Sequence, residues 1–176
     1  MQNLISQPLV ITMDKGMHYP DKEAYKFVVN RLKELGVRLE DIADIVYGLE
    51  YKYLPNLTKK DCLDVVKTVV HKREVLNNAM VGLELDRLSQ AELVKEPLLS
   101  IIKNDVGVFG VDEVLGIAIS QLYGSIGVTN YGFADKDKTG IIKKLDTNDR
   151  QVNTFSDDLV GAIASAAAAK VTHDNS

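Results

Sequence analysis

The sequence predicts an all-α fold, a single-domain helical bundle built around a buried central helix of small residues. The first observation is that apolar residues recur at i, i+3 and i+4 spacing along most of the chain, which is the period of a helix. The second is that strand patterns are poor, since the best candidate, residues 8–13, has no obvious partner. The third is the segment FSDDLVGAIASAAAAK at 155–170, because a helix that is apolar all round is expected at the centre of a bundle.

The helical period divides the chain into predicted helices in the order 21–35, 39–53, 58–71, 72–88, 97–104, 112–126, 131–145 and 155–171. Asp21 follows Pro20 in a position to cap the first helix, and Gly36 ends it. Thr58, with Asp61 three residues later, resembles a capping box, in which each side chain satisfies a free backbone N–H. Local sequence therefore supplies start and stop signals as well as the period.

Composition limits the class of protein. No Ser/Pro-rich linker divides the chain, so residues 1–176 are expected to form one domain, with 1–19 and 172–176 peripheral or poorly ordered. A hydrophobic content of 45% is enough for a substantial core. The formal net charge of −4 and the dispersed basic residues argue against a nucleic-acid partner. The single cysteine, Cys62, excludes an internal disulfide and favours a reducing compartment.

The sequence pattern predicts neither a signal peptide nor a membrane-spanning helix. The first residues lack the basic start and the long apolar run of a signal peptide. No window reaches the ~20 uninterrupted apolar residues that a membrane helix needs. We therefore expect a soluble, cytoplasmic protein without a transmembrane helix, for which a peripheral position on the inner face of the membrane and assembly into a homo-oligomer stay open.

Two short stretches of the chain match position by position. VDEVLGIAIS at 111–120 and SDDLVGAIAS at 156–165 each place an acidic pair before two aliphatic residues, a glycine and an Ala/Ile run that ends in serine. Both stretches head predicted helices with little side-chain bulk, so the two helices can pack closely. If the two helices start at the same end of the bundle, their acidic pairs converge.

Four converging carboxylates would repel one another unless a cation lay among them. Oxygen ligands without nitrogen or sulfur partners suit Mg²⁺, with Mn²⁺ as the alternative, and such a metal commonly holds and polarises a phosphate. A second interpretation needs no ligand. Acidic residues are favoured in a first helical turn, and Thr154 with Asp157 matches a capping box. On these residues alone both interpretations stay open.

Three segments carry a resemblance to a known family. GVDEVLGIAIS at 110–120, YGFADKDKTGIIKKLD at 131–146 and NTFSDDLVGAIASAAAAK at 153–170 together resemble the phosphatidylglycerophosphatase A family, in particular its compact branch described as YutG-like or low-temperature-requirement-C-like. The resemblance implies an all-helical fold with a central helix. It also implies a Mg²⁺-dependent phosphatase that removes the terminal phosphate of phosphatidylglycerophosphate to give phosphatidylglycerol.

The resemblance also implies site residues. The family's acidic pairs correspond to metal ligands here, namely Asp112, Glu113, Asp157 and Asp158. Its segment with an aspartate three residues before a lysine corresponds to Asp135 and Lys138. The chain departs from the family where Phe-Arg is replaced by Tyr131-Gly132, and where the proline after the lysine is replaced by Thr139.

The expected mechanism assigns a role to each of these groups. Asp135 or Asp158 positions the attacking water, while the metal and Lys138 neutralise the phosphate. Lys143 and Arg73 are further candidates for binding the phosphate oxygens of the substrate. The expected partner is a phospholipid headgroup phosphate at the membrane surface.

Two other functions remain as alternatives. One is hydrolysis of a soluble phosphate ester or nucleotide, although helical enzymes of that kind typically use ExxE spacing rather than adjacent acids. The other is a non-catalytic helical regulator, in which the acidic residues only stabilise helix starts.

Overall fold

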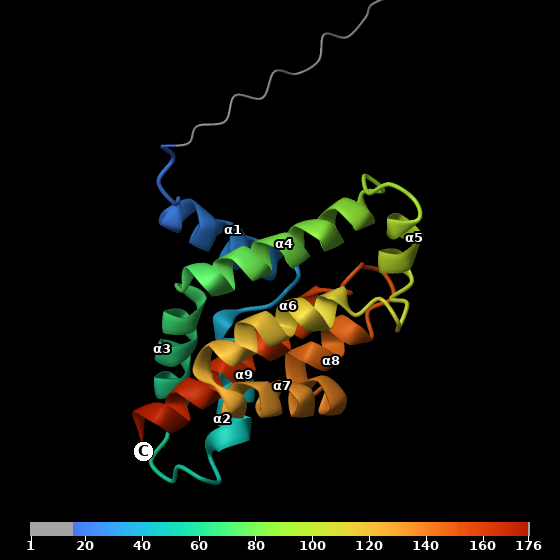
Figure 1. The fold of residues 1–176 in the computed structure, drawn as a ribbon. Helices are drawn as coiled ribbons and strands as arrows, with labels where there is room; N and C mark the ends of the chain where they lie inside the picture. The colour runs from blue at the N-terminus through green and yellow to red at the C-terminus, as the bar shows by residue number, and fades with distance from the viewer. Residues whose placement is uncertain (1–15, 176) are drawn as a thin grey trace, which may run out of the picture.

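The computed structural model describes residues 16–175, and this part of the chain is helical without strands (Figure 1). The strand candidate at 8–13 lies outside the described residues. The elements follow one another as α1 (Asp21–Glu34), α2 (Leu39–Glu50), α3 (Lys59–Val70), α4 (Arg73–Gln90), α5 (Leu98–Lys103), α6 (Val111–Ser120), the 3₁₀ turn η1 (Gln121–Tyr123), α7 (Ser125–Asp137), α8 (Gly140–Asp146) and α9 (Ser156–Asp174). The predicted all-α class is confirmed.

The capping box at the start of α3 is confirmed. Thr58 Oγ1 accepts a hydrogen bond from the backbone N–H of Asp61 at 3.2 Å, and the Asp61 carboxylate accepts one from the N–H of Thr58 at 3.0 Å. The cap expected from Asp21 is wrong, because Asp21 is the first helical residue and makes no capping bond. The Asp21 carboxylate instead accepts hydrogen bonds from Arg73.

Two segments that were each predicted as one helix are interrupted by residues with positive φ. The segment expected as one helix over 112–126 divides into α6, η1 and the start of α7, and Gly124 at the break has a φ of +81°. The segment over 131–145 divides into α7 and α8, and there Lys138 and Gly140 have φ values of +40° and +58°. Such angles end a helix, since right-handed helical residues all have negative φ.

The central helix of small residues is confirmed as α9. Every residue from 156 to 169 is buried, and α2, α3, α4, α6, α7 and α8 all pack against the helix. Figure 1 shows α9 passing behind α6 and α7. The alanines and Gly161 leave room for these neighbours on all sides. No helix among residues 16–175 is long and apolar enough to cross a membrane.

A glycine lets α4 approach the start of α9 closely. A Cβ on Gly82 would lie 2.7 Å from Leu159 Cδ1 and 2.9 Å from Phe155 Cβ, which is closer than real side chains pack. Asp86 lies one helical turn after Gly82 and therefore faces the same partner. The close approach at Gly82 thus brings the Asp86 carboxylate to the first residues of α9.

Candidate active site

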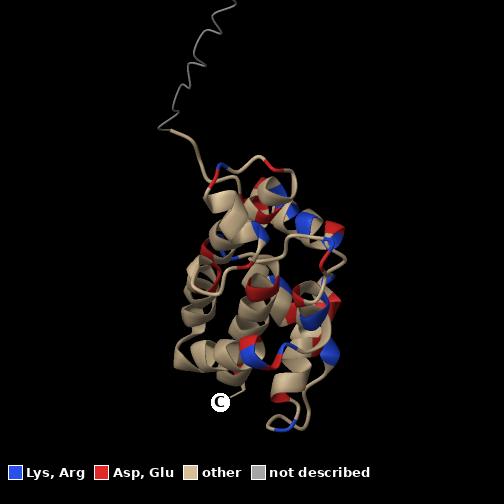
Figure 2. Ribbon diagram, turned by 90° about the vertical axis from the view of Figure 1, so that its right-hand side faces the viewer, with Lys and Arg blue, Asp and Glu red and all other residues tan. Residues whose placement is uncertain are grey.

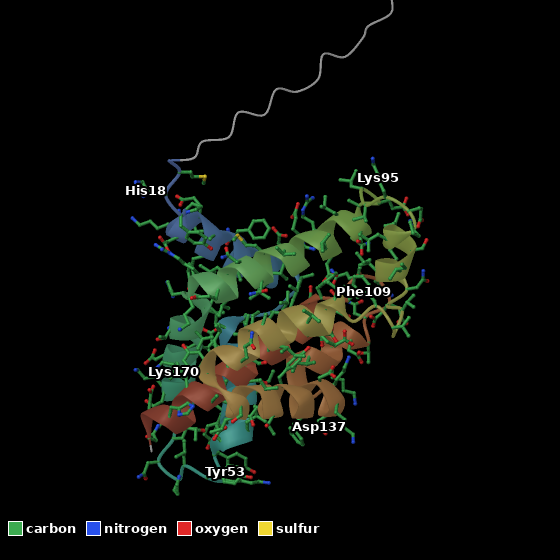
Figure 3. All side chains as sticks on the ribbon, viewed as in Figure 1. His18, Tyr53, Lys95, Phe109, Asp137 and Lys170 are labelled. Carbon is green, nitrogen blue, oxygen red and sulfur yellow. The ribbon has the colours of Figure 1, made fainter. Side chains whose placement is uncertain are left out.

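The acidic pairs of α6 and α9 converge at one end of the bundle. Asp112 and Glu113 lie in the first turn of α6, and Asp158 lies in the first turn of α9. One carboxylate oxygen from each of these three residues lies within 4.8 Å of the other two. Figure 3 shows Phe109, just before α6, and Asp137, the last residue of α7, on this same side of the molecule. The convergence that the matched stretches predicted is present for three of the four carboxylates.

These three carboxylates, Asp112, Glu113 and Asp158, form what we call the acidic triad. Asp112 and Asp158 are each only 6% exposed. Asp112 Oδ1 and Glu113 Oε2 are buried and have no hydrogen-bond partner among residues 16–175. Burial, together with the Glu113 carboxyl beside it, raises the pKa of Asp112. Burial and the charges of Asp157, Asp135 and Asp112 raise the pKa of Asp158 to about 8.

The triad fits a hard divalent cation. Its donors are all carboxylate oxygens, which such cations prefer. Within the described part of the chain two of its oxygens lack partners, and buried polar atoms without partners cost free energy. A cation bound to the three carboxylates would satisfy these oxygens and offset the repulsion that, after burial, contributes to the raised pKa values of Asp112 and Asp158. The triad could therefore hold a metal ion.

Asp157 has a different partner from its neighbour in the sequence. Lys138 Nζ lies 2.9 Å from Asp157 Oδ2 and 2.7 Å from Asp146 Oδ1, and 3.9 Å from Asp135 Oδ1. The structure therefore places Asp157, expected as a metal ligand, in an ion-pair cluster beside the triad. Figure 2, which faces the right-hand side of Figure 1, shows acidic and basic positions interspersed along the helices.

The lysine of this cluster is held in its charged form. Burial alone favours the neutral amine, but the hydrogen bonds to Asp146 and Asp157 outweigh it and raise the pKa of Lys138. Lys138 also ends α7 in the left-handed conformation, with φ +40° and ψ +66°. That conformation costs a non-glycine residue about 1–2 kcal/mol. A charged ammonium therefore lies in a strained backbone position between the buried carboxylate of Asp157 and the exposed carboxylate of Asp146.

Tyr131 of α7 also belongs to the site, although in the sequence it was visible only as a departure from the family pattern. Its ring packs directly on Gly116 of α6, where a Cβ would lie 2.3 Å from the Tyr131 Oη. Tyr131 Oη is buried and makes no hydrogen bond of ordinary geometry within residues 16–175. Burial, and then the charges of Asp158 and Asp135, raise the pKa of Tyr131. The sequence did contain an indication of this contact. Both matched stretches have a glycine at the same position, and a glycine in a helix can mark a place where a bulky side chain packs against the backbone.

The start of α9 is not capped in the way the sequence suggested. The predicted capping box of Thr154 with Asp157 is wrong, because the Thr154 hydroxyl donates to the Ile102 carbonyl at 2.6 Å. Asp86 of α4 takes its place. Its Oδ2 accepts hydrogen bonds from the Ser156 N–H at 2.9 Å and from the Ser156 hydroxyl at 2.5 Å, and the Phe155 N–H donates to the same carboxylate at 3.2 Å.

Asp86 was missed by sequence reasoning. It is fully buried, and burial raises its pKa to about 7 although the hydrogen bonds from Ser156 and Phe155 act in the opposite direction. A signal was present in α4, because Asp86 continues the buried face formed by Val75, Ala79 and Gly82. An aspartate on an otherwise apolar helix face needs a partner, and here the partner is a helix start 70 residues later.

The two further candidates for binding phosphate are exposed side chains. Arg73 pairs with Asp21 at 2.8 Å and begins α4, whereas Asp86 lies on the same helix 13 residues later. At 1.5 Å per residue, Arg73 is roughly 20 Å along the helix from the capped start of α9. Lys143 is exposed on α8. The structure thus brings together Asp112, Glu113, Asp158, Asp135, Lys138 and Asp157, and leaves Arg73 outside this group.

The fold and site define a class: all-helical proteins in which acidic first turns of two packed helices meet beside a lysine-centred ion-pair cluster. The chain belongs to the phosphatidylglycerophosphatase A family, whose model matches residues 33–173. At the level of the family, this membership supports a phosphatase in lipid metabolism.

The relatives belong to the compact branch. YutG of Bacillus subtilis is 46% identical over 144 residues, which cover 81% of this chain and 87% of that protein. YpjQ of the same organism is 42% identical over 155 residues, 88% of each chain, and both relatives are described as uncharacterized. The solved structure of the low temperature requirement C protein from Listeria monocytogenes is 43% identical, covers 86% of this chain and 96% of its own, and superposes with a TM-score of 0.84.

Proposed function

We propose that this protein is a Mg²⁺-dependent phosphatase that hydrolyses the terminal phosphate of phosphatidylglycerophosphate to give phosphatidylglycerol. The observation that carries the proposal is the acidic triad, in which oxygens of two buried carboxylates and one half-buried carboxylate from two helices lie within 4.8 Å of one another. Membership of the phosphatidylglycerophosphatase A family supports the choice of substrate.

Asp112, Glu113 and Asp158 would hold the Mg²⁺. When bound, the ion supplies charge that stabilises the phosphoryl group and favours a nucleophilic water. The protein's contribution is to fix these three ligands before substrate arrives. Asp112 and Glu113 share the first turn of α6, and Asp158 is held by a helix whose start is tied to Asp86.

Lys138 would bind an oxygen of the substrate phosphate. An ammonium group has three N–H donors, and Lys138 uses two of them on Asp146 and Asp157. The third donor is left for the phosphoryl oxygen. Because the two carboxylates keep Lys138 charged and fix its position, it can oppose the negative charge that develops on the phosphoryl group.

Asp135 would accept a proton from the attacking water. It lies on α7, one turn before Lys138, and its charge is close enough to Asp158 to contribute to the raised pKa of that residue. Asp135 is also more exposed than the triad aspartates. A more exposed carboxylate at the edge of the site suits a general base better than Asp158, whose raised pKa favours the protonated form.

The protein would reach its lipid from the bilayer surface. The outer face of α6 exposes Val111, Val114 and Ile117 by 43%, 60% and 41%, and Val108 just before the helix is 92% exposed. These side chains stand on the helix that carries Asp112 and Glu113. Contact of this face with the acyl region would bring a lipid headgroup to the triad.

The direct test is phosphate release from phosphatidylglycerophosphate in mixed micelles, with and without Mg²⁺, beside a panel of soluble phosphate esters and nucleotides. We expect Mg²⁺-dependent release that is lost in Asp112→Asn and Asp158→Asn. Asp64→Asn is the matched control, since Asp64 is an exposed aspartate of α3 paired with Lys60 at 2.7 Å. If phosphate is released only from the soluble esters or nucleotides, the substrate is a soluble phosphate and not a lipid. If no compound releases phosphate, a regulatory protein is favoured.

A further inference from the structure

The side chain of Tyr131 lies between the two helices that carry the acidic triad. The helices α6, α7 and α9 pack against one another (Figure 1). A Cβ on Gly116 of α6 would lie 2.9 Å from Cε2 of the Tyr131 ring, and closer still to Cζ and Oη. A Cβ on Gly161 of α9 would lie 3.9 Å from Cδ2 and Cε2 of the same ring. One ring from α7 therefore fills the space left by a glycine on each of α6 and α9.

These two glycines have the same position in the two matched stretches. Gly116 comes three residues after Glu113, and Gly161 comes three residues after Asp158. Residues three or four apart lie on the same face of a helix, about one turn from each other. The ring of Tyr131 therefore lies about one helical turn from the triad carboxylates, on the faces of α6 and α9 that carry them.

The hydroxyl group of Tyr131 is not explained by packing. The residue is only 4% exposed, and its Oη is buried without a hydrogen bond of ordinary geometry within residues 16–175. A buried hydroxyl group without a partner costs free energy, and a phenylalanine would place the same ring between the glycines without that cost. The hydroxyl group therefore indicates a polar contact that belongs to the function of the site.

Among the carboxylates near this hydroxyl group, that of Asp158 acts on it most strongly. Burial raises the pKa of Tyr131, and the charge of Asp158 contributes next, ahead of that of Asp135. The effect is mutual, because the Tyr131 hydroxyl lowers the pKa of Asp158 against the larger effects of burial and of the neighbouring charges. A phenolic O–H can donate, and an ionised carboxylate can only accept. The two groups are therefore complementary neighbours.

We propose that Tyr131 is a positioning residue for the acidic triad, with its ring between Gly116 and Gly161 and its hydroxyl group donating to the Asp158 carboxylate when the triad holds a divalent cation. The inference rests on the proposed function in one respect, namely that a cation binds at the triad. Groups that hydrogen-bond to a ligating carboxylate fix its orientation, and their loss lowers metal affinity. The acidic pairs therefore depend on a residue of a third helix.

The first test is the Mg²⁺ affinity of Tyr131→Phe, which keeps the ring and removes only the hydroxyl group. Calorimetric titration of Mg²⁺ into the metal-free protein should show about tenfold weaker binding than in the wild type. The Tm in EDTA should stay the same or rise, because the variant loses a buried hydroxyl group that has no partner within residues 16–175. A loss of affinity below about twofold would overturn the inference.

Tyr123→Phe is the matched control for this change. Tyr123 follows α6 at the end away from the triad, and Lys72 Nζ lies 5.1 Å from the centre of its ring. Removal of its hydroxyl group should leave the Mg²⁺ affinity unchanged. An equal loss of affinity in both variants would show that the effect is not specific to Tyr131, and it would also overturn the inference.

A second test reports which tyrosine lies beside the ion. The chain has seven tyrosines and no tryptophan, so light absorbed by tyrosine can reach a bound Tb³⁺ only from one of these rings. Tb³⁺ prefers the same oxygen ligands and emits after energy transfer from a nearby ring. We expect this emission from the wild type and Tyr123→Phe, and its loss in Tyr131→Phe at saturating Tb³⁺. Equal emission from Tyr131→Phe would show that another tyrosine lies beside the ion and would overturn the inference.

The inference and the proposed function fail in different ways. Mg²⁺-dependent phosphate release with unchanged Mg²⁺ affinity in Tyr131→Phe would keep the phosphatase and remove the role of Tyr131. Weaker Mg²⁺ binding in Tyr131→Phe without phosphate release from any ester would keep the role of Tyr131 and remove the phosphatase. No binding of Mg²⁺ to the wild type would overturn both.

Discussion

The carboxylate of Asp86 accepts hydrogen bonds from both the backbone N–H and the hydroxyl of Ser156, at 2.9 and 2.5 Å. A residue of α4 thereby fixes the residue that immediately precedes Asp157 and Asp158. The helix start and the site are therefore set by one long-range contact rather than by the local sequence.

Removal of the Asp86 carboxylate should destabilise the protein strongly. Asp86→Ala leaves the Phe155 and Ser156 N–H groups and the Ser156 hydroxyl without their acceptor in a dry environment. Each unsatisfied buried donor costs about 1–3 kcal/mol, so we expect a loss of at least about 3 kcal/mol in the free energy of unfolding. Urea denaturation measures this loss, and Asp64→Ala on the exposed face of α3 is the control. A loss below about 1 kcal/mol would contradict the assigned cap.

The stability of the metal-free protein should fall as the pH rises from about 5 to 8. Burial raises the pKa of Asp86 to about 7, above the ordinary value near 3.8 of an unfolded chain. Between these two values the folded protein binds more protons than the unfolded chain, so each increase in pH favours unfolding. Melting temperatures in EDTA across this range test the slope. In Asp86→Asn, which cannot ionise, the slope should be shallower; an equal slope in the variant would assign the effect to other groups.

Mg²⁺ should stabilise the protein through the triad and not through Asp157. A ligand at a hundredfold excess over its Kd adds about 2.7 kcal/mol, which corresponds to about 5–10 °C in Tm for a chain of this size. We expect this shift in the wild type and its loss in Asp112→Asn and Asp158→Asn. Asp157→Asn should retain most of it, because Asp157 binds Lys138 at 2.9 Å and lies outside the triad. Loss of the shift in Asp157→Asn would place this residue among the ligands.

Gly116 should tolerate no side chain while Tyr131 is present. The Cβ of Gly116→Ala would lie 2.3 Å from Tyr131 Oη and 2.4 Å from its Cζ, so α6 or the ring must move. Overpacking of this kind costs typically 1–3 kcal/mol. Tyr131→Ala should relieve it, so a double-mutant cycle measures the coupling. Gly132→Ala is the control, since a Cβ there meets no atom within 4 Å. Additive effects of the two changes would show that the contact is not tight.

The sequence predicted what depends on local patterns. The helical period located the helices, and the small side chains of residues 155–170 predicted that α9 lies at the centre of the bundle. The match between two short stretches predicted that four carboxylates converge if the two helices start at the same end, and three of them, Asp112, Glu113 and Asp158, do so. These features could be predicted because period, side-chain volume and repetition are each visible within a few residues.

The remainder depends on contacts between distant residues. The cap of α9 comes from Asp86, so a local search for a capping box selected Thr154 instead. The break between α7 and α8 falls at Lys138 and Gly140, which both have positive φ, and a lysine does not by itself indicate such a break. The Lys138 side chain pairs there with Asp146 and Asp157. Tyr131 can lie in the site only because Gly116, on another helix, has no side chain in the space that the tyrosine ring fills.

The burial of α9 has a consequence for how the protein moves. Asp157 and Asp158 are carried by the helix with the least access to solvent, packed by neighbours on every side. Its backbone amides can exchange their hydrogens with water only when most of the bundle opens, which is the rarest of the protein's fluctuations. The part of the proposed site that lies on α9 therefore belongs to the slowest-exchanging core, and we expect motion at this site to come from α6, α7 and the surface loops.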